Sequence, residues 1–117
     1  MLVFDATALV GLFNSHPTVF MLWQRADEGA TEIVVPALAI VEAGATLKTS
    51  TTAWDRFLWM PTITVLPLGE RAAVEIAGWS GTFAARHALW EARALDCPLV
   101  TQDPDLYGPG LADIQVV

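Results

Sequence analysis

The chain opens with the stretch Met1–Thr7, of sequence MLVFDAT, which decides the fold class. Three apolar residues run directly into Asp5, with no polar residue alternating between them. Such a run is typical of a strand that is buried on both faces of a parallel sheet. Asp5 then stands at the carboxyl end of the strand, where open α/β sheets bind their ligands. The alternative is that Asp5 only caps the helix that follows, for which Thr7 is also a candidate cap.

The composition predicts a single folded domain over residues 1–117. With 54% hydrophobic residues and a mean hydropathy of +0.46, the chain is too apolar to be disordered. No apolar run is long enough to span a membrane, and no basic segment precedes the first apolar residues. We therefore expect neither a transmembrane helix nor a signal peptide. The single cysteine, Cys97, excludes an internal disulfide and suits a reducing cytoplasm.

The net charge of -7 argues against a general affinity for nucleic acids, because phosphate binding depends on clustered cations. It does not exclude a nucleic-acid substrate held through a metal ion, and it suits a basic protein partner. The six cations are scattered along the sequence, and Arg86 is expected to be a solvated helix residue. The five tryptophans favour core or interface positions over stacking on bases.

Apolar periodicity along the chain predicts strands that alternate with helices. The fold class expected from this alternation is a three-layer α/β/α sandwich with a mainly parallel central sheet. A capping box at Thr52 and Asp55 marks the start of the helix that carries Trp54, Phe57 and Trp59. A polar turn is expected at 102–110. The remaining strands are expected at 33–35, 63–66, 98–101 and 114–117, and the remaining helices at 7–13, 17–27, 37–47, 69–79 and 83–95.

Glu42 is expected on the buried face of the helix at 37–47, because its helical neighbours Leu38, Val41 and Ala45 form an apolar stripe. A buried acid is costly unless it is paired or bound to a metal ion.

Asp103 and Asp105 follow the strand at 98–101, again at a carboxyl end. Acids that converge on one sheet edge repel one another, and such repulsion commonly prepares a site for a divalent cation. The alternative for Asp103 and Asp105 is turn chemistry, since Asp-Pro-Asp is a good turn sequence.

The motifs at these places resemble those of the PIN domain family, and most closely its short VapC-type ribonuclease toxins. Phe4–Thr7 is similar to the opening aspartate and hydroxyl of the family, and 36–42 is similar to the approach to its glutamate. Leu99–Asp103 is similar to the closing Thr-x-Asp, and Tyr107 lies where an aromatic residue usually follows. The resemblance implies a cytoplasmic, Mg²⁺- or Mn²⁺-dependent endoribonuclease, paired with an antitoxin protein, with Asp5, Glu42 and Asp103 as metal ligands.

One position departs from the family pattern. The third family acid begins an Asp-Ala pair, and this chain has His87-Ala88 instead. His87 is itself a candidate ligand, better suited to Mn²⁺ than to Mg²⁺. Glu91, one helical turn further on, is the other candidate. If neither serves, the chain is a catalytically lapsed module that binds an antitoxin-like partner.

Two further expectations concern function. The aromatic residues Trp54, Phe57 and Trp59 exceed what one helical stripe buries, which predicts a homodimer or a helical partner over this surface. A phosphatase with an aspartate nucleophile is disfavoured, because the only lysine, Lys48, lies a helix beyond the second strand.

Overall fold

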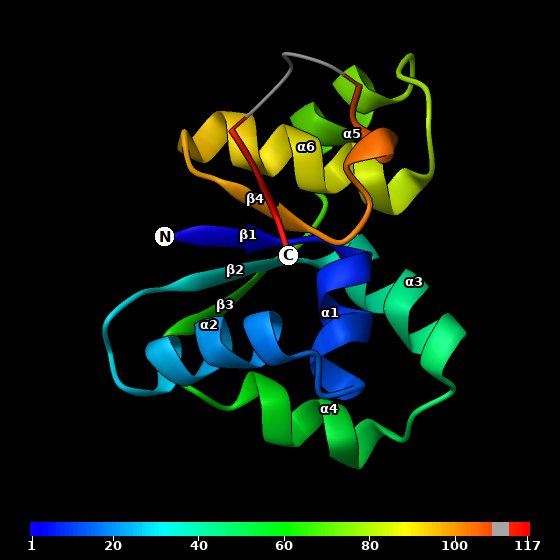
Figure 1. Cartoon of the computed structure of the whole chain (residues 1–117). Coiled ribbons are helices and arrows are strands. Elements are labelled where there is room, and N and C mark those ends of the chain that lie inside the picture. Colours follow the sequence, from blue (N-terminus) through cyan, green and yellow to red (C-terminus); the bar gives the residue numbers. More distant parts are fainter. Residues whose placement is uncertain (109–112) are drawn as a thin grey trace.

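A computed structural model of the chain, which describes residues 1–108 and 113–117, contains a five-stranded sheet in which all paired strands are parallel (Figure 1). The strand order is β3-β2-β1-β4-β5, so β1 (Leu2–Phe4) lies at the centre. Its neighbours are β2 (Ile33–Pro36) and β4 (Leu99–Thr101), and the outer strands are β3 (Ile63–Leu66) and β5 (Ile114–Val116). The parallel sheet expected from the sequence is confirmed.

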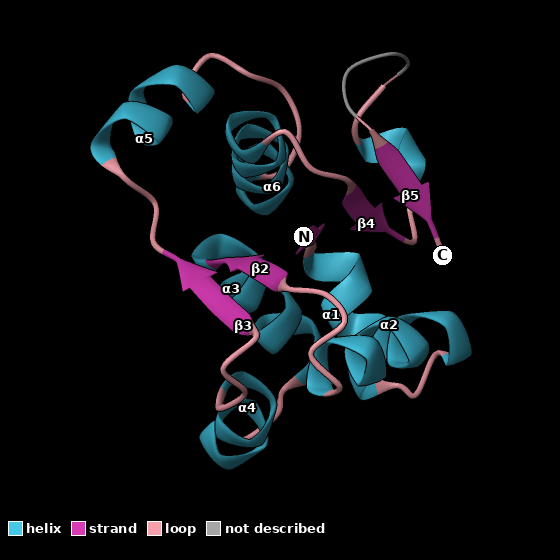
Figure 2. Ribbon diagram, turned by 90° about the vertical axis from the view of Figure 1, so that its left-hand side faces the viewer, coloured by secondary structure: helices cyan, strands magenta, loops and turns pink. Residues whose placement is uncertain are grey.

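Helices cover both faces of this sheet, which confirms the three-layer arrangement (Figures 1 and 2). Helices α5 (Glu70–Ile76) and α6 (Phe83–Leu95) lie on one face. On the other lie α1, α2 and α4; α3 follows β2 and contacts both α1 and α6. The bounds of these four helices are Ala6–Phe13, Pro17–Asp27, Ala37–Leu47 and Thr51–Leu58.

The central strand joins two apolar cores, one on each face of the sheet. Phe4 belongs to the core with the helix residues Leu9 and Val19, and Val3 belongs to the core with Ala88 of α6. Val3 and Phe4 are both fully buried, as the unbroken apolar run of the sequence predicted. Asp5 follows directly and is therefore held at a fixed point of the carboxyl edge.

Two predicted helix starts are wrong by part of a turn. Asp5, not Thr7, caps α1, and Thr7 lies within the helix. Ser50, not Thr52, caps α4, and its hydroxyl accepts a hydrogen bond from the Ala53 amide. Ser, Thr and Asp are all good caps, so a sequence that offers two of them two positions apart leaves the choice to tertiary packing. Helix α5 is also shorter than the span expected at 69–79.

The polar turn predicted after β4 contains a short 3₁₀ helix, Pro104–Leu106. The end of the predicted turn, at residues 109 and 110, lies outside the described residues. Within the part of the chain that the structure describes, no helix has the length and apolar character needed to cross a membrane.

Candidate functional site

Asp5 is the best-held polar side chain at the carboxyl edge of the sheet, with 1% of its surface exposed. Its Oδ1 accepts hydrogen bonds from the Ala8 amide at 2.9 Å and from the Thr7 hydroxyl at 2.7 Å. Its Oδ2 accepts one from the Tyr107 hydroxyl at 2.6 Å. Asp5 therefore caps α1 and also stands at the edge where ligands bind, so the two interpretations of this residue do not exclude each other.

Two threonines connect this carboxylate to the loop that carries Asp103. The Thr7 hydroxyl accepts a hydrogen bond from the Gln102 amide at 2.8 Å and lies 3.1 Å from the Thr101 hydroxyl. Because Thr7 donates its own proton to Asp5, Thr101 is the donor of that pair. Thr101 in turn accepts from the Asp103 amide at 3.0 Å. The ends of β1 and β4 are thus joined by side chains as well as by strand pairing.

Glu42 approaches the same edge from α3. It is half-buried and lines a cavity of about 440 Å³ together with Thr7 and Gln102. The predicted apolar stripe around it is wrong, because Val41 is 66% exposed and Ala45 is exposed. The small side chains on the other side of α3, Ala39 and Ala43, face the core instead. Glu42 therefore borders the buried face and remains open to the cavity.

The Tyr107 hydroxyl lies close enough to three acids for their charges to raise its pKa. Burial raises the pKa of its hydroxyl well above the usual value, and the neighbouring Asp5 carboxylate raises it further through its charge and its hydrogen bond. The charges of Glu42 and Asp103 act in the same direction. One phenol therefore lies within electrostatic reach of three carboxylates that come from β1, α3 and the loop after β4.

The donor chemistry of this cluster fits a hard divalent cation. Carboxylate oxygens are the ligands that Mg²⁺ and Mn²⁺ take. From the described residues Oδ2 of Asp5 accepts one hydrogen bond, and a carboxylate oxygen has two lone pairs. Among the described residues, however, no three His, Cys, Asp or Glu side chains stand close enough together to hold a metal ion. The acids share one edge without being drawn into a single coordination group.

His87 lies in the middle of α6. Its side chain is fully buried, and its Nε2 is 3.3 Å from Oε1 of Glu91 without hydrogen-bond geometry. Burial lowers the pKa of His87 and raises the pKa of Glu91. Of the residues that the structure describes, only Glu91 makes a polar contact with the imidazole. A ligand role for either residue stays a prediction.

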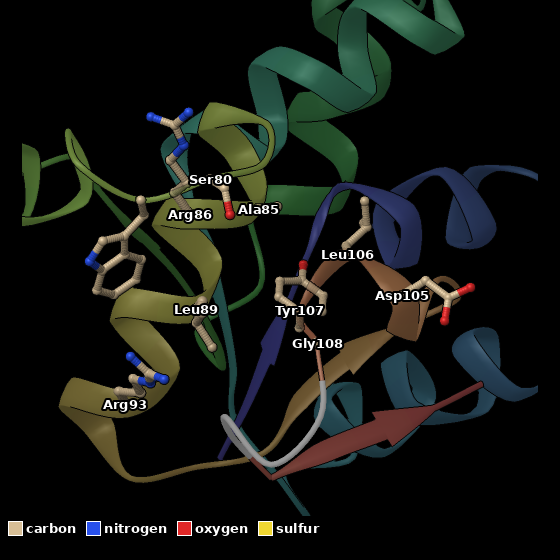
Figure 3. Close-up of a pocket in the computed structure, with 10 residues that line it drawn as sticks. Ser80, Ala85, Arg86, Leu89, Arg93, Asp105, Leu106, Tyr107 and Gly108 are labelled. Carbon is tan, nitrogen blue, oxygen red and sulfur yellow. The ribbon is translucent and has the colours of Figure 1, made fainter.

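Asp105 is exposed in the 3₁₀ helix, as turn chemistry predicts, and it lines a separate cavity beside Tyr107 (Figure 3). Sequence reasoning noted Tyr107 as an aromatic residue but missed its bond to Asp5, which is 102 positions away. The one signal in the sequence was the choice of Tyr over Phe. Both rings fill a core equally well, so the hydroxyl of Tyr107 indicates a hydrogen-bond partner.

Comparison with known proteins yields structural similarity alone. No protein family model matches the sequence, and no curated protein matches it. Among solved structures, the chain is similar to VapBC2 from Rickettsia felis bound to a DNA fragment from their promoter. The TM-score is 0.70 at 11% sequence identity, over 98% of this chain and 97% of that one.

Two further structures agree with this similarity. A toxin–antitoxin complex from Klebsiella pneumoniae matches with a TM-score of 0.69 at 13% identity, over 99% of this chain and 97% of that one. A protein from Pyrobaculum aerophilum matches with a TM-score of 0.55 at 24% identity, over 97% and 89%. The resemblance found in the sequence motifs is therefore confirmed at the level of the fold: the chain has the fold of the PIN-domain VapC toxins.

Proposed function

We propose that the protein is a divalent-metal-dependent endoribonuclease of a toxin–antitoxin pair, which hydrolyses phosphodiester bonds in RNA. The observation that carries the proposal is the placement of three acids at one edge of the sheet: Asp5 and Asp103 are linked through the hydroxyls of Thr7 and Thr101. Glu42 lines a cavity together with Thr7. The full-length similarity to toxin–antitoxin complexes supports it.

In this proposal the three carboxylates hold one or two Mg²⁺ or Mn²⁺ ions. A divalent cation bound there supplies positive charge that offsets the charge developing on the phosphodiester. Asp5 is oriented for this task by its bonds to Thr7 and to the start of α1. Thr101 fixes the amide of Asp103 and thereby the direction in which that side chain leaves the sheet. His87 and Glu91 are the proposed replacements for the third family acid.

The proposed partners are an RNA substrate, an antitoxin protein and a second copy of the chain, in the cytoplasm. Support for a protein partner comes from apolar side chains that remain exposed: Trp59 at 74%, Val74 at 73% and Phe83 at 69%. Trp54, by contrast, packs against Phe13 and Phe57, so only Trp59 of the α4 region is left for a partner to cover.

The second candidate function is a PIN-fold module that binds an antitoxin-like protein without cutting RNA. Two observations favour it. The described acids form no metal-binding group of three, and His87 is buried against Glu91. Both functions predict partner binding, so metal binding and RNA cleavage separate them.

The test measures both properties on the purified protein. We expect Mn²⁺ to raise the melting temperature and to support cleavage of a labelled single-stranded RNA, with both effects removed by EDTA. Asp103→Asn should lower the cleavage rate by about 10²-fold or more, because removal of a charged metal ligand weakens the charge stabilisation of the reaction. Asp27→Asn, a change at an exposed carboxylate at the end of α2, is the matched control. Absence of both cleavage and any metal-induced shift would favour the binding module.

A further inference from the structure

A cavity of about 510 Å³ lies between α6 and the loop after β4. Arg86 and Arg93 line it on the α6 side, and Tyr107 and Asp105 lie across from them (Figure 3). Tyr107 is shared with the acid cluster, since its hydroxyl contacts Asp5 while its ring lines this cavity. The cavity therefore adjoins the candidate catalytic edge, separated from it by one aromatic ring.

Half of the positive charge of the chain gathers here. Of the six cations, Arg86 and Arg93 line this cavity, and Arg71 lines an adjoining cavity of about 430 Å³. Trp79 lines both cavities, and the Arg93 guanidinium stands 5.3 Å from the centre of its ring. The cations that look scattered in the sequence are brought together because α5 and α6 pack against each other. Glu75, which pairs with Arg71 at 4.0 Å, and Asp105 also line these cavities, so the three cations exceed the acids by one on a chain with a net charge of -7.

Contacts with the protein hold Arg86 in place. Its Nε donates to the Gly81 carbonyl at 2.9 Å and one Nη to the Ile76 carbonyl at 3.4 Å, while its guanidinium lies over the Phe83 ring at 5.1 Å. These two bonds use two of the five N–H donors of an arginine. A positioned guanidinium loses less conformational entropy when it binds an anion than a freely moving side chain does.

We propose that this cavity binds one nucleotide of a single-stranded RNA, next to the bond that the acid cluster cleaves; the proposal rests on the nuclease function proposed above. Arg86 and Arg93 each bind one of the two phosphates that flank it, and its base packs against the Trp79 indole. The volume lies in the range of small-ligand pockets and suits one nucleotide.

An acidic peptide is the other ligand that two arginines attract. RNA fits better, because it uses the flat aromatic surface as well as the charges, and because Tyr107 of the cavity also bonds to Asp5 of the acid cluster. Overall affinity should be modest, as the net charge requires. Two phosphate contacts predict a slope of about −1.4 when log Kobs is plotted against log salt concentration.

The experiment measures binding of a fluorescein-labelled single-stranded RNA by anisotropy in EDTA, where metal-dependent cleavage does not occur. Arg93→Gln should weaken binding at least about fivefold and reduce the salt slope to about −0.7. Trp79→Leu should weaken it by a similar factor, and Trp79→Phe should retain most of the affinity. The matched control is Arg25→Gln, which removes the same group from an exposed position outside the cavity and should bind like the wild type. Circular dichroism establishes that each variant is folded.

Three results would overturn the proposal. In the first, the cavity variants bind RNA with the affinity of the wild type. In the second, Arg25→Gln weakens binding as much as Arg93→Gln does. The third is a poly-glutamate peptide that binds as tightly as RNA and responds equally to Trp79→Leu, which would assign the cavity to a protein partner. Cavity-dependent RNA binding without cleavage in Mn²⁺ would support this site while contradicting the proposed nuclease. Cleavage that the cavity variants leave unchanged would overturn this site alone.

Discussion

Asp5 and His87 are both buried polar side chains, with 1% and 0% of their surface exposed, but their surroundings differ completely. The Asp5 carboxylate accepts three hydrogen bonds. The two imidazole nitrogens of His87 make no hydrogen bond with any described residue. A buried polar group destabilises the folded state unless hydrogen bonds within the protein replace those it made with water. The cost of burying Asp5 is offset in this way, and the cost of burying His87 is not.

The difference follows from where each residue lies. Asp5 stands between a strand and a helix, where the first amides of α1 have no helical partner and accept a side-chain cap. The parallel neighbour β4 brings Thr101 to the same edge. His87, in contrast, faces inward from the middle of a helix, where every nearby amide already donates to the helix itself. Polar sites at strand ends can be fully satisfied, whereas a polar side chain inside a helix layer depends on another side chain.

The largest expected effect comes from removing the satisfied group. Asp5→Ala deletes the cap of α1 and leaves the Tyr107 hydroxyl buried without its acceptor. We expect the free energy of unfolding to fall by about 3 kcal/mol, the sum of one helix cap and one broken buried hydrogen bond. Urea unfolding measured in EDTA checks this value. A loss below that of the exposed control Asp27→Ala would mean that the network around Asp5 contributes little to stability.

A smaller effect is expected from Tyr107→Phe, which keeps the ring and removes only the hydroxyl. The Asp5 Oδ2 atom then lies buried without its donor, and the free energy of unfolding should fall by about 1–2 kcal/mol. The same change frees a lone pair on Oδ2, so Mn²⁺ should raise the melting temperature more in this variant than in the wild type. Melting curves with and without Mn²⁺ measure both effects. A metal response that is smaller than that of the wild type would contradict the competition between Tyr107 and a cation.

The sequence was enough to predict the sheet, because the apolar runs at β1 and β2 contain no alternation and each is followed by a helix. It also predicted which acids lie at the carboxyl edge, since parallel strands all end on one side. The bond between Tyr107 and Asp5 was out of reach, because it depends on how the loop after β4 folds back over β1. Local patterns carry no information on a contact across 102 positions.

The solvent-facing side of helices was predicted less well. The apolar residues around Glu42 suggested a buried stripe, yet Val41 is largely exposed and the alanines on the opposite side face the core. Alanine contributes weakly to an apolar sequence pattern, although its small side chain allows close helix packing. The stripe of larger residues therefore gave the stronger signal, and it pointed to the wrong face of α3. The proximity of Arg71, Arg86 and Arg93 was missed for a related reason. Arg71 belongs to α5 and the other two to α6, and only the packing of these helices brings them together.

The smallest expected effect at neutral pH, and the one with a characteristic pH dependence, concerns His87. Burial lowers its pKa below the value of 6.5 that describes the unfolded chain. Between these two pKa values the unfolded chain binds more protons than the folded one, so stability is lost as the pH falls through 6.5 toward the folded value. Glu91 has the opposite sign: its pKa is raised above 4.5, so its contribution to stability grows as the pH falls toward 4.5.

His87→Leu isolates the histidine contribution, because Glu91 is present in both proteins. At pH 7.5 the neutral imidazole and the leucine side chain both pack in α6, and we expect unfolding free energies within about 1 kcal/mol of each other. As the pH falls to 5.5, the wild type should lose stability relative to the variant. Urea titrations in EDTA at several pH values measure this divergence, and Glu91→Gln, which keeps the histidine, should retain the wild-type loss. Parallel curves for the wild type and His87→Leu would mean that the imidazole is protonated as easily in the folded chain as in the unfolded one. That result would remove the contrast with Asp5, because His87 would then have a polar partner that stabilises its charge.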